Sequence, residues 1–169
     1  IEFFKEVSER SKLLGRTQGK INMLFIETPE IAEMFLASVK NSVTYPLLMV
    51  EYFDEEITYH GSGYSRDITV AFAVLSMREN KVRGVDNARI VIYEKCKPAA
   101  EAVLSLLRDR VESGTLNHNG YLISLADTIQ GNWIGPLHND LYGWRIELSL
   151  RVPGAPCYRA DDWLPIIEE

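Results

Sequence analysis

Apolar and polar residues alternate strictly along the stretch from Tyr142 to Val152. The apolar set is Tyr142, Trp144, Ile146, Leu148, Leu150 and Val152, and the residues between them are Gly143, Arg145, Glu147, Ser149 and Arg151. A period of two places successive side chains on opposite faces of an extended chain, so the pattern predicts a β-strand with one face on a core. It favours an antiparallel sheet covered on one side over a doubly wound parallel sheet, whose strands are buried on both faces.

Three further segments carry strand patterns. The stretch 47–53 is continuously apolar, which indicates a central strand, and 68–74 alternates apolar residues with small outward-facing alanines. Residues 121–130 form the third of these predicted strands. We interpret three polar or glycine-containing stretches as loops: 54–66 with His60-Gly61-Ser62-Gly63 at its tip, 78–84, and 131–141.

Helical spacing appears in three places. Residues 2–14 carry an apolar stripe, and a second helix is predicted after Thr28, a good N-cap followed by Pro29. In 86–113 a 3/4 spacing predicts one long helix, capped by Asp86, kinked near Pro98 and ended by Gly114. Its stripe is Ala88, Ile92, Cys96, Ala99, Val103, Leu106 and Arg110. The β-branched run 90–93 leaves a strand as the alternative there, and the apolar run 23–26 fits either state.

The predicted fold is therefore α+β: an antiparallel sheet of about four strands packed on one side by a long kinked helix and an N-terminal helix. We expect a single domain over 1–152, followed by a proline-rich C-terminal tail, 153–169, which is unusually apolar. Composition adds little, since 46% apolar and 25% charged residues are ordinary for a globular chain. The net charge of −6 argues against nucleic acid as the main partner, and no apolar run approaches the ~20 residues of a membrane span.

Candidate chemistry is sparse. The His60-Gly61-Ser62-Gly63 segment matches neither a nucleophile elbow nor a phosphate-binding loop, so a hairpin tip is the favoured interpretation. His138 and Asp140, with His118 or His60, offer possible metal ligands without the paired spacing of a metal site. Cys96 and Cys157 are expected to be free thiols, Cys96 in the core. We therefore predict no catalytic residues, metal or cofactor.

The order of elements carries the remaining signal. A leading helix is followed by a strand, Tyr45-Pro46-Leu47-Leu48-Met49-Val50-Glu51, then by a hairpin loop and a second strand from Asp67 to Leu75. A long helix comes next and contains the runs Tyr93-Glu94-Lys95-Cys96 and Leu106-Leu107-Arg108-Asp109. Two further strands close the plan, and the last opens with Asp140-Leu141-Tyr142-Gly143-Trp144. Over roughly residues 30–152 this plan resembles the small neck and tail proteins of tailed phages and prophages: tail terminators, tail completion proteins and head–tail connectors.

The resemblance implies a structural subunit rather than an enzyme. Such proteins form homo-oligomeric rings that cap or join the tail tube, contact other tail or neck proteins, and pass from the cytoplasm into the virion. The candidate interaction residues are His60 and Tyr64 near the hairpin tip, and Tyr158, Trp163 and Ile166 in the tail. The tail is expected to pack either on its own domain or on a neighbouring subunit.

Two other functions stay open. One is a small-molecule-binding domain or enzyme with a pocket between the sheet and the long helix, using His60, His138 or Asp140. The other is a protein-interaction module of the same fold that acts alone.

Overall fold

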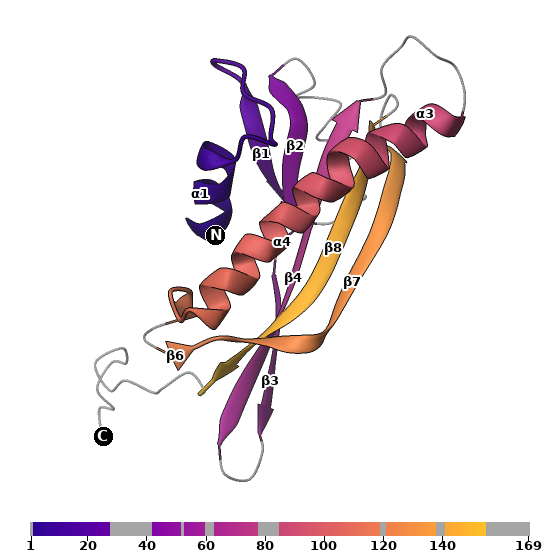
Figure 1. The fold of residues 1–169 in the computed structure, drawn as a ribbon. Coiled ribbons are helices and arrows are strands. Elements are labelled where there is room, and N and C mark those ends of the chain that lie inside the picture. The colour runs from indigo at the N-terminus through magenta and orange to yellow at the C-terminus, as the bar shows by residue number, and fades with distance from the viewer. Residues whose placement is uncertain are drawn as a thin grey trace, which may run out of the picture.

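The computed structural model describes residues 2–27, 42–51, 53–59, 63–77, 85–118, 121–137 and 141–154. Its elements in chain order are α1 (Glu2–Arg10), β1 (Ile21–Ile26), β2 (Val43–Glu51), β3 (Asp54–Tyr59), β4 (Tyr64–Met77), α3 (Val85–Ile90), η1 (Val91–Cys96), α4 (Lys97–Glu112), β5 (Asn117–His118), β6 (Tyr121–Leu122), β7 (Ser124–Leu137) and β8 (Leu141–Pro153). Figure 1 shows the long helix lying across the sheet, with α1 beside it. The predicted α+β class is confirmed.

The sheet is larger than predicted and is mixed rather than antiparallel. Six of the described strands form it in the order β1-β2-β4-β8-β7, with β3 pairing with the far part of β4. The strand β1 pairs in parallel with β2, while the other pairs are antiparallel. The run 23–26, which fitted either state, lies in β1. The stretch 47–53 is central as predicted, although its strand begins at Val43 and ends at Glu51.

Two stretches predicted as loops are strands. The first, 54–66, holds β3 and the start of β4, and the second, 131–141, holds the second half of β7. Both strands are largely exposed, so they need no apolar alternation and leave no periodic signal. The glycines and Pro136 are tolerated in β7 because it lies at the edge of the sheet.

The long helix is confirmed, including residues 90–93. It runs as α3, η1 and α4 without a break, and η1 is a π-helical turn that ends two residues before Pro98. An irregular turn therefore occurs just before the predicted kink. The backbone helix begins at Val85, so Asp86 lies inside it rather than before it. It ends near Gly114, whose φ of 69° is the left-handed conformation that glycine adopts freely.

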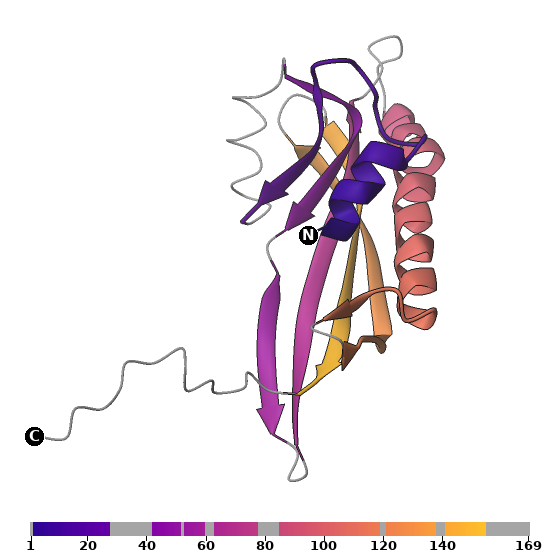
Figure 2. The same ribbon diagram turned by 90° about the vertical axis from the view of Figure 1, so that its left-hand side faces the viewer.

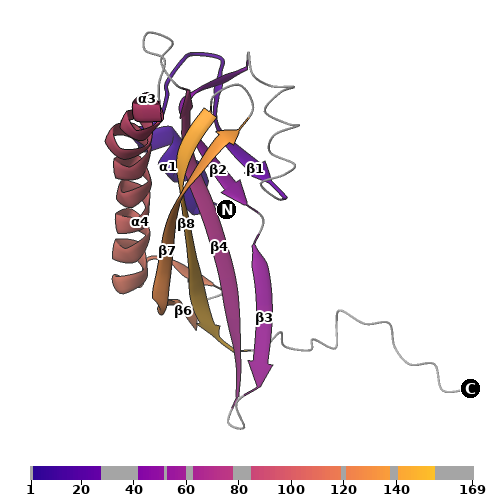
Figure 3. The same cartoon turned by 90° about the vertical axis from the view of Figure 1, so that its right-hand side faces the viewer.

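The helices cover one face of the sheet, which we call the helix face. Figures 2 and 3 show the helical layer on one side of the strands. The largest core cluster joins Phe4 and Val7 of α1 and Val103 of α4 to Phe72 and Ile146 of the sheet. The predicted helix stripe is correct through Val103, but Leu107 and Val111 are then buried in place of Leu106 and Arg110.

The opposite face of the sheet, which we call the far face, was expected to carry no packed layer, and part of it is buried. At the end formed by β1 and β2 it carries a second buried cluster that includes Leu47, Met49, Ala73 and Leu75, each fully buried. Ala71 and Ala73 were expected to face outward, and both are covered. The expectation of a sheet packed on one side therefore does not hold at the end of the sheet formed by β1 and β2.

Several predictions fall outside the described residues. They are the helix after Thr28, the loop 78–84, the hairpin tip at 60–62, the loop residues His138 and Asp140, and residues 155–169 of the tail.

Candidate functional site

Of the five residues predicted to make interactions, only Tyr64 lies within the described part of the chain. His60, Tyr158, Trp163 and Ile166 lie outside it. Tyr64 opens β4, and its ring lies 5.0 Å from the ring of Tyr59, measured between centroids. The structure therefore replaces much of the predicted polar loop with a strand pair, and the two tyrosine rings at its far end contact each other at an interplanar angle of 50°.

This strand pair forms an arm, defined here as β3 together with residues 64–69 of β4. Figure 2 shows the arm extending past the end of α4. Tyr64 has the same parity along β4 as Phe72, so it lies on the helix face, and its partner Tyr59 lies there too. Ile57, two residues earlier, shares that face, and all three side chains are 48–62% exposed. The helix face of the sheet thus continues beyond the helix that covers it, and there exposed apolar side chains lie on the same face as the Arg66–Glu55 ion pair, whose atoms are 3.3 Å apart.

The far face carries charged residues beside its buried cluster. Arg145 donates from Nε and Nη2 to the two carboxylate oxygens of Glu51 at 2.6 and 2.8 Å, and from Nη1 to Glu147 at 2.6 Å. These hydrogen bonds to carboxylates raise the pKa of Arg145 well above its ordinary value. Further along, Arg151 makes a bidentate pair with Asp67 across β4 and β8. With every guanidinium in this set occupied by carboxylates, the arrangement suits structural pairing rather than anion binding.

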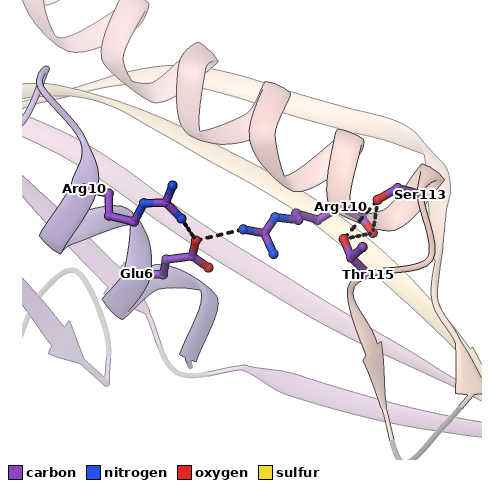
Figure 4. Close-up of polar contacts among 5 residues, drawn as sticks. All are labelled: Glu6, Arg10, Arg110, Ser113 and Thr115. Atoms are coloured by element: carbon purple, nitrogen blue, oxygen red, sulfur yellow. Dashed lines mark hydrogen bonds and ion pairs between the residues drawn. The ribbon is translucent and has the colours of Figure 1, made fainter.

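A groove of about 290 Å³ separates α1 from α4. Its rim holds Glu6, which accepts hydrogen bonds from Arg10 of its own helix and from Arg110 of α4, the latter at 2.8 Å (Figure 4). At the end of α4, Ser113 and Thr115 both donate to the carbonyl oxygen of Arg110, at 3.3 and 3.2 Å. The Glu6–Arg110 contact joins the N-terminal helix to the long helix, and the Ser113 and Thr115 hydrogen bonds satisfy a carbonyl group at the end of the long helix.

A second cavity, of about 370 Å³, lies between the start of the long helix and the edge strand β7. We call it the aromatic pocket; its lining includes Arg89, Ile92, Tyr93, Trp133, Pro136 and Tyr142. Trp133 is 58% exposed and Tyr93 is 50% exposed. Tyr93 also packs on Trp144 at 5.8 Å, and the ammonium group of Lys97 lies 4.9 Å from the Trp144 ring. Exposed aromatic rings beside two cationic side chains make this a candidate recognition surface.

Sequence reasoning missed the aromatic pocket because it treated 131–141 as a loop. Trp133 pairs directly with Trp144 across β7 and β8, which puts both rings on the helix face. One signal was available: Tyr93 and Lys97 are four residues apart, and that spacing places them on one face of a helix. Trp133 is 58% exposed, so it is not a core residue.

Of the groups considered for chemistry, His60, His138 and Asp140 lie outside the described residues. Cys96 is free and fully buried as predicted, and its thiol lies 3.6 Å from the carbonyl oxygen of Tyr142. Burial raises the pKa of the Cys96 thiol to about 12. No cluster of three or more potential metal ligands occurs in the part of the chain that the structure covers.

No family model matches the sequence, and no curated protein matches it. Among the helices whose residues are described, none is long and apolar enough to cross a membrane.

Proposed function

We propose that this chain is a structural subunit that assembles with copies of itself into a ring, in the manner of the phage neck and tail proteins that its order of elements resembles. The observation that carries the proposal is the arm. Ile57, Tyr59 and Tyr64 lie exposed on the helix face of the sheet, past the end of α4. An exposed apolar surface that continues from a core onto a projecting hairpin is typical of a protein–protein contact.

The edges of the sheet support the same proposal. Among the described residues, β7 has a partner strand on one side only, which is β8, and β3 likewise has only β4. A strand edge carries free N–H and C=O groups that pair readily with a strand of another chain. Because the two edges differ, a contact between them is head-to-tail, and such contacts close into a ring when the rotation between copies permits.

In this proposal the protein needs no cofactor or metal and performs no catalysis. Its partners are further copies of the chain and other tail or neck proteins, and its final location is the virion.

The arm is tested by replacing its apolar residues and measuring assembly. The double substitution Tyr59→Ser and Tyr64→Ser should lower the mass of the assembled species, measured by light scattering after size exclusion, because it removes two aromatic contacts from the proposed interface. Leu13→Ser is the matched control, since Leu13 is 49% exposed and lies away from the arm. Assembly by the double variant equal to that of the unchanged chain would reject the arm as an interface.

The aromatic pocket favours a second candidate, a small-molecule-binding domain, because a cavity of this kind lies between the edge strand β7 and the long helix. The residues that the hypothesis named, His60, His138 and Asp140, lie outside the described part of the chain. A compound that raises the melting temperature of the unchanged chain, and does not raise that of Trp133→Ala, would support this second function.

A further inference from the structure

The aromatic pocket has the chemistry of a peptide-binding site. Trp133 and Tyr93 present half-exposed rings, and Pro136 and Ile92 complete an apolar lining. Arg89 is exposed at the end of α3 and adds positive charge. Aromatic rings of this kind bind proline and aliphatic side chains of extended peptides, and nearby cations favour an acidic peptide.

The chain itself contains a segment with this composition. Residues 161–169 read Asp-Asp-Trp-Leu-Pro-Ile-Ile-Glu-Glu: an aromatic, proline and aliphatic centre with two carboxylates on each side. These residues lie outside the described part of the structure, and only their sequence enters the argument. Their charge is opposite to that of Arg89 in the pocket lining and of Lys97 beside it, whose ammonium group lies 5.7 Å from the Tyr93 ring and 3.7 Å from Glu101. Their apolar centre matches the rings of the pocket.

Chain length bears on whose pocket the segment can fill. Trp133 of the pocket lies opposite Trp144 of β8, and Gly154 follows the end of that strand. The ten residues from Trp144 to Gly154 span about 33 Å at about 3.3 Å each. The nine residues from Gly154 to Trp163 span at most about 32 Å when fully extended. Trp163 therefore reaches the pocket of its own chain only if residues 154–163 are fully extended, which costs conformational entropy, whereas the pocket of a neighbouring copy requires no such extension.

We infer that the segment 161–169 of one copy binds the aromatic pocket of a neighbouring copy. Trp163 and Pro165 pack against Trp133 and Tyr93, and the flanking carboxylates face Arg89 and Lys97. This inference rests on the proposed function, since it supplies a head-to-tail contact of the kind that builds a ring. It goes beyond that function by naming both surfaces and by assigning the segment to a neighbour rather than to its own domain.

The experiment uses full-length chains that each lack one side of the contact. Trp133→Ser disables the pocket and Trp163→Ser disables the segment; Leu122→Ser, at a site 66% exposed on β6, is the control. Light scattering should show that each Trp variant loses higher assembly while Leu122→Ser keeps it. An equal mixture of the two Trp variants retains one intact pocket and one intact segment, so it should form particles of two chains that grow no further.

The outcomes separate the inference from the proposed function. Rings from the unchanged chain and from both Trp variants would overturn the inference and leave the proposed function standing. If the unchanged chain is a monomer, the proposed function fails, and a fluorescein-labelled peptide of residues 155–169 titrated onto the full-length Trp163→Ser chain decides the contact. Binding that Trp133→Ser or Arg89→Glu weakens by about tenfold or more would support it, as expected for loss of an anchor; unchanged or absent binding would overturn it.

Discussion

At the residue scale, burial separates two arginine pairs that look alike in the sequence. Arg145 and Arg151 both lie on β8 and both hold a carboxylate with two hydrogen bonds. The side chains of Arg145 and Glu51 are only 21% and 10% exposed, whereas that of Arg151 is 56% exposed. Coulomb attraction is strong and an unpaired charge is costly only where water is excluded, so the first pair is the structural one.

Removing Arg145 should destabilise the protein strongly. Arg145→Ala leaves Glu51 buried without its partner, and we expect the free energy of unfolding to fall by about 3 kcal/mol. Arg151→Ala is the matched control and should cost far less, because its pair is open to solvent. Urea unfolding of the two variants checks this, and equal losses would contradict the assignment.

Cys96 should make stability depend on pH in alkaline solution. Burial raises the pKa of the thiol from its ordinary value near 9 to about 12 in the folded chain. The folded state therefore favours the protonated thiol, and this contribution is fully present below pH 9 and is lost as pH rises towards 12. Relative to Cys96→Ala, the chain should lose about 1.4 kcal/mol of stability between pH 8 and pH 10.

The control for this pH effect is a buried residue that does not titrate. Val103 lies on the same helix and is 4% exposed, so the stability cost of Val103→Ala should not vary with pH. A cost of Cys96→Ala that is likewise constant from pH 8 to pH 10 would show that the thiol titrates alike in the folded and unfolded chains.

At the element scale, predictability follows burial. The strand β8 was located from its alternation because Ile146, Leu148 and Leu150 are buried while Arg145, Glu147 and Ser149 are not. The edge strand β7 and the arm strand β3 were missed because exposed strands can be polar and can contain glycine and proline. The arm and the pocket are built on these strands, so the sequence indicated the core of the fold better than its candidate sites.

The parallel pairing of β1 was also beyond the sequence pattern. The apolar run 23–26 is short enough to fit a strand or a buried helix equally, and only its pairing with β2 decides between them. The helix stripe shows a milder limit: the spacing of three or four residues allowed Leu106 or Leu107 as the next buried position, and the structure buries Leu107.

The pairing of β4 with β8 depends on a glycine. A Cβ atom at Gly143 would lie 2.4 Å from the backbone oxygen of Val74 and 2.5 Å from a methyl carbon of Leu75. Gly143→Ala should therefore push the two strands apart and lower the free energy of unfolding by about 1–3 kcal/mol, the usual cost of overpacking.

Gly63→Ala is the matched control for that substitution, because a Cβ atom at Gly63 would meet nothing within 4 Å. Thermal or urea unfolding of both variants measures the difference. If Gly143→Ala proved as stable as Gly63→Ala, the close approach of β8 to β4 at this point would be wrong.

At the scale of the whole molecule, the two candidate contact surfaces lie at opposite ends. The arm extends from one end of the sheet, and the aromatic pocket lies at the other, beside α3 (Figure 1). A molecule with different contact surfaces at its two ends associates head-to-tail, and such association yields either a closed ring or an open filament. Closure is therefore what distinguishes the proposed ring subunit from a polymerising chain.

The most direct test is the mass of the unchanged chain, measured by light scattering after size exclusion at several concentrations, with negative-stain images of the same peak. The proposal predicts one discrete mass that is a multiple of the 19.2 kDa chain, stable on dilution, and closed rings in the images. A mass of one chain at every concentration, or particles that lengthen without closing as concentration rises, would contradict it.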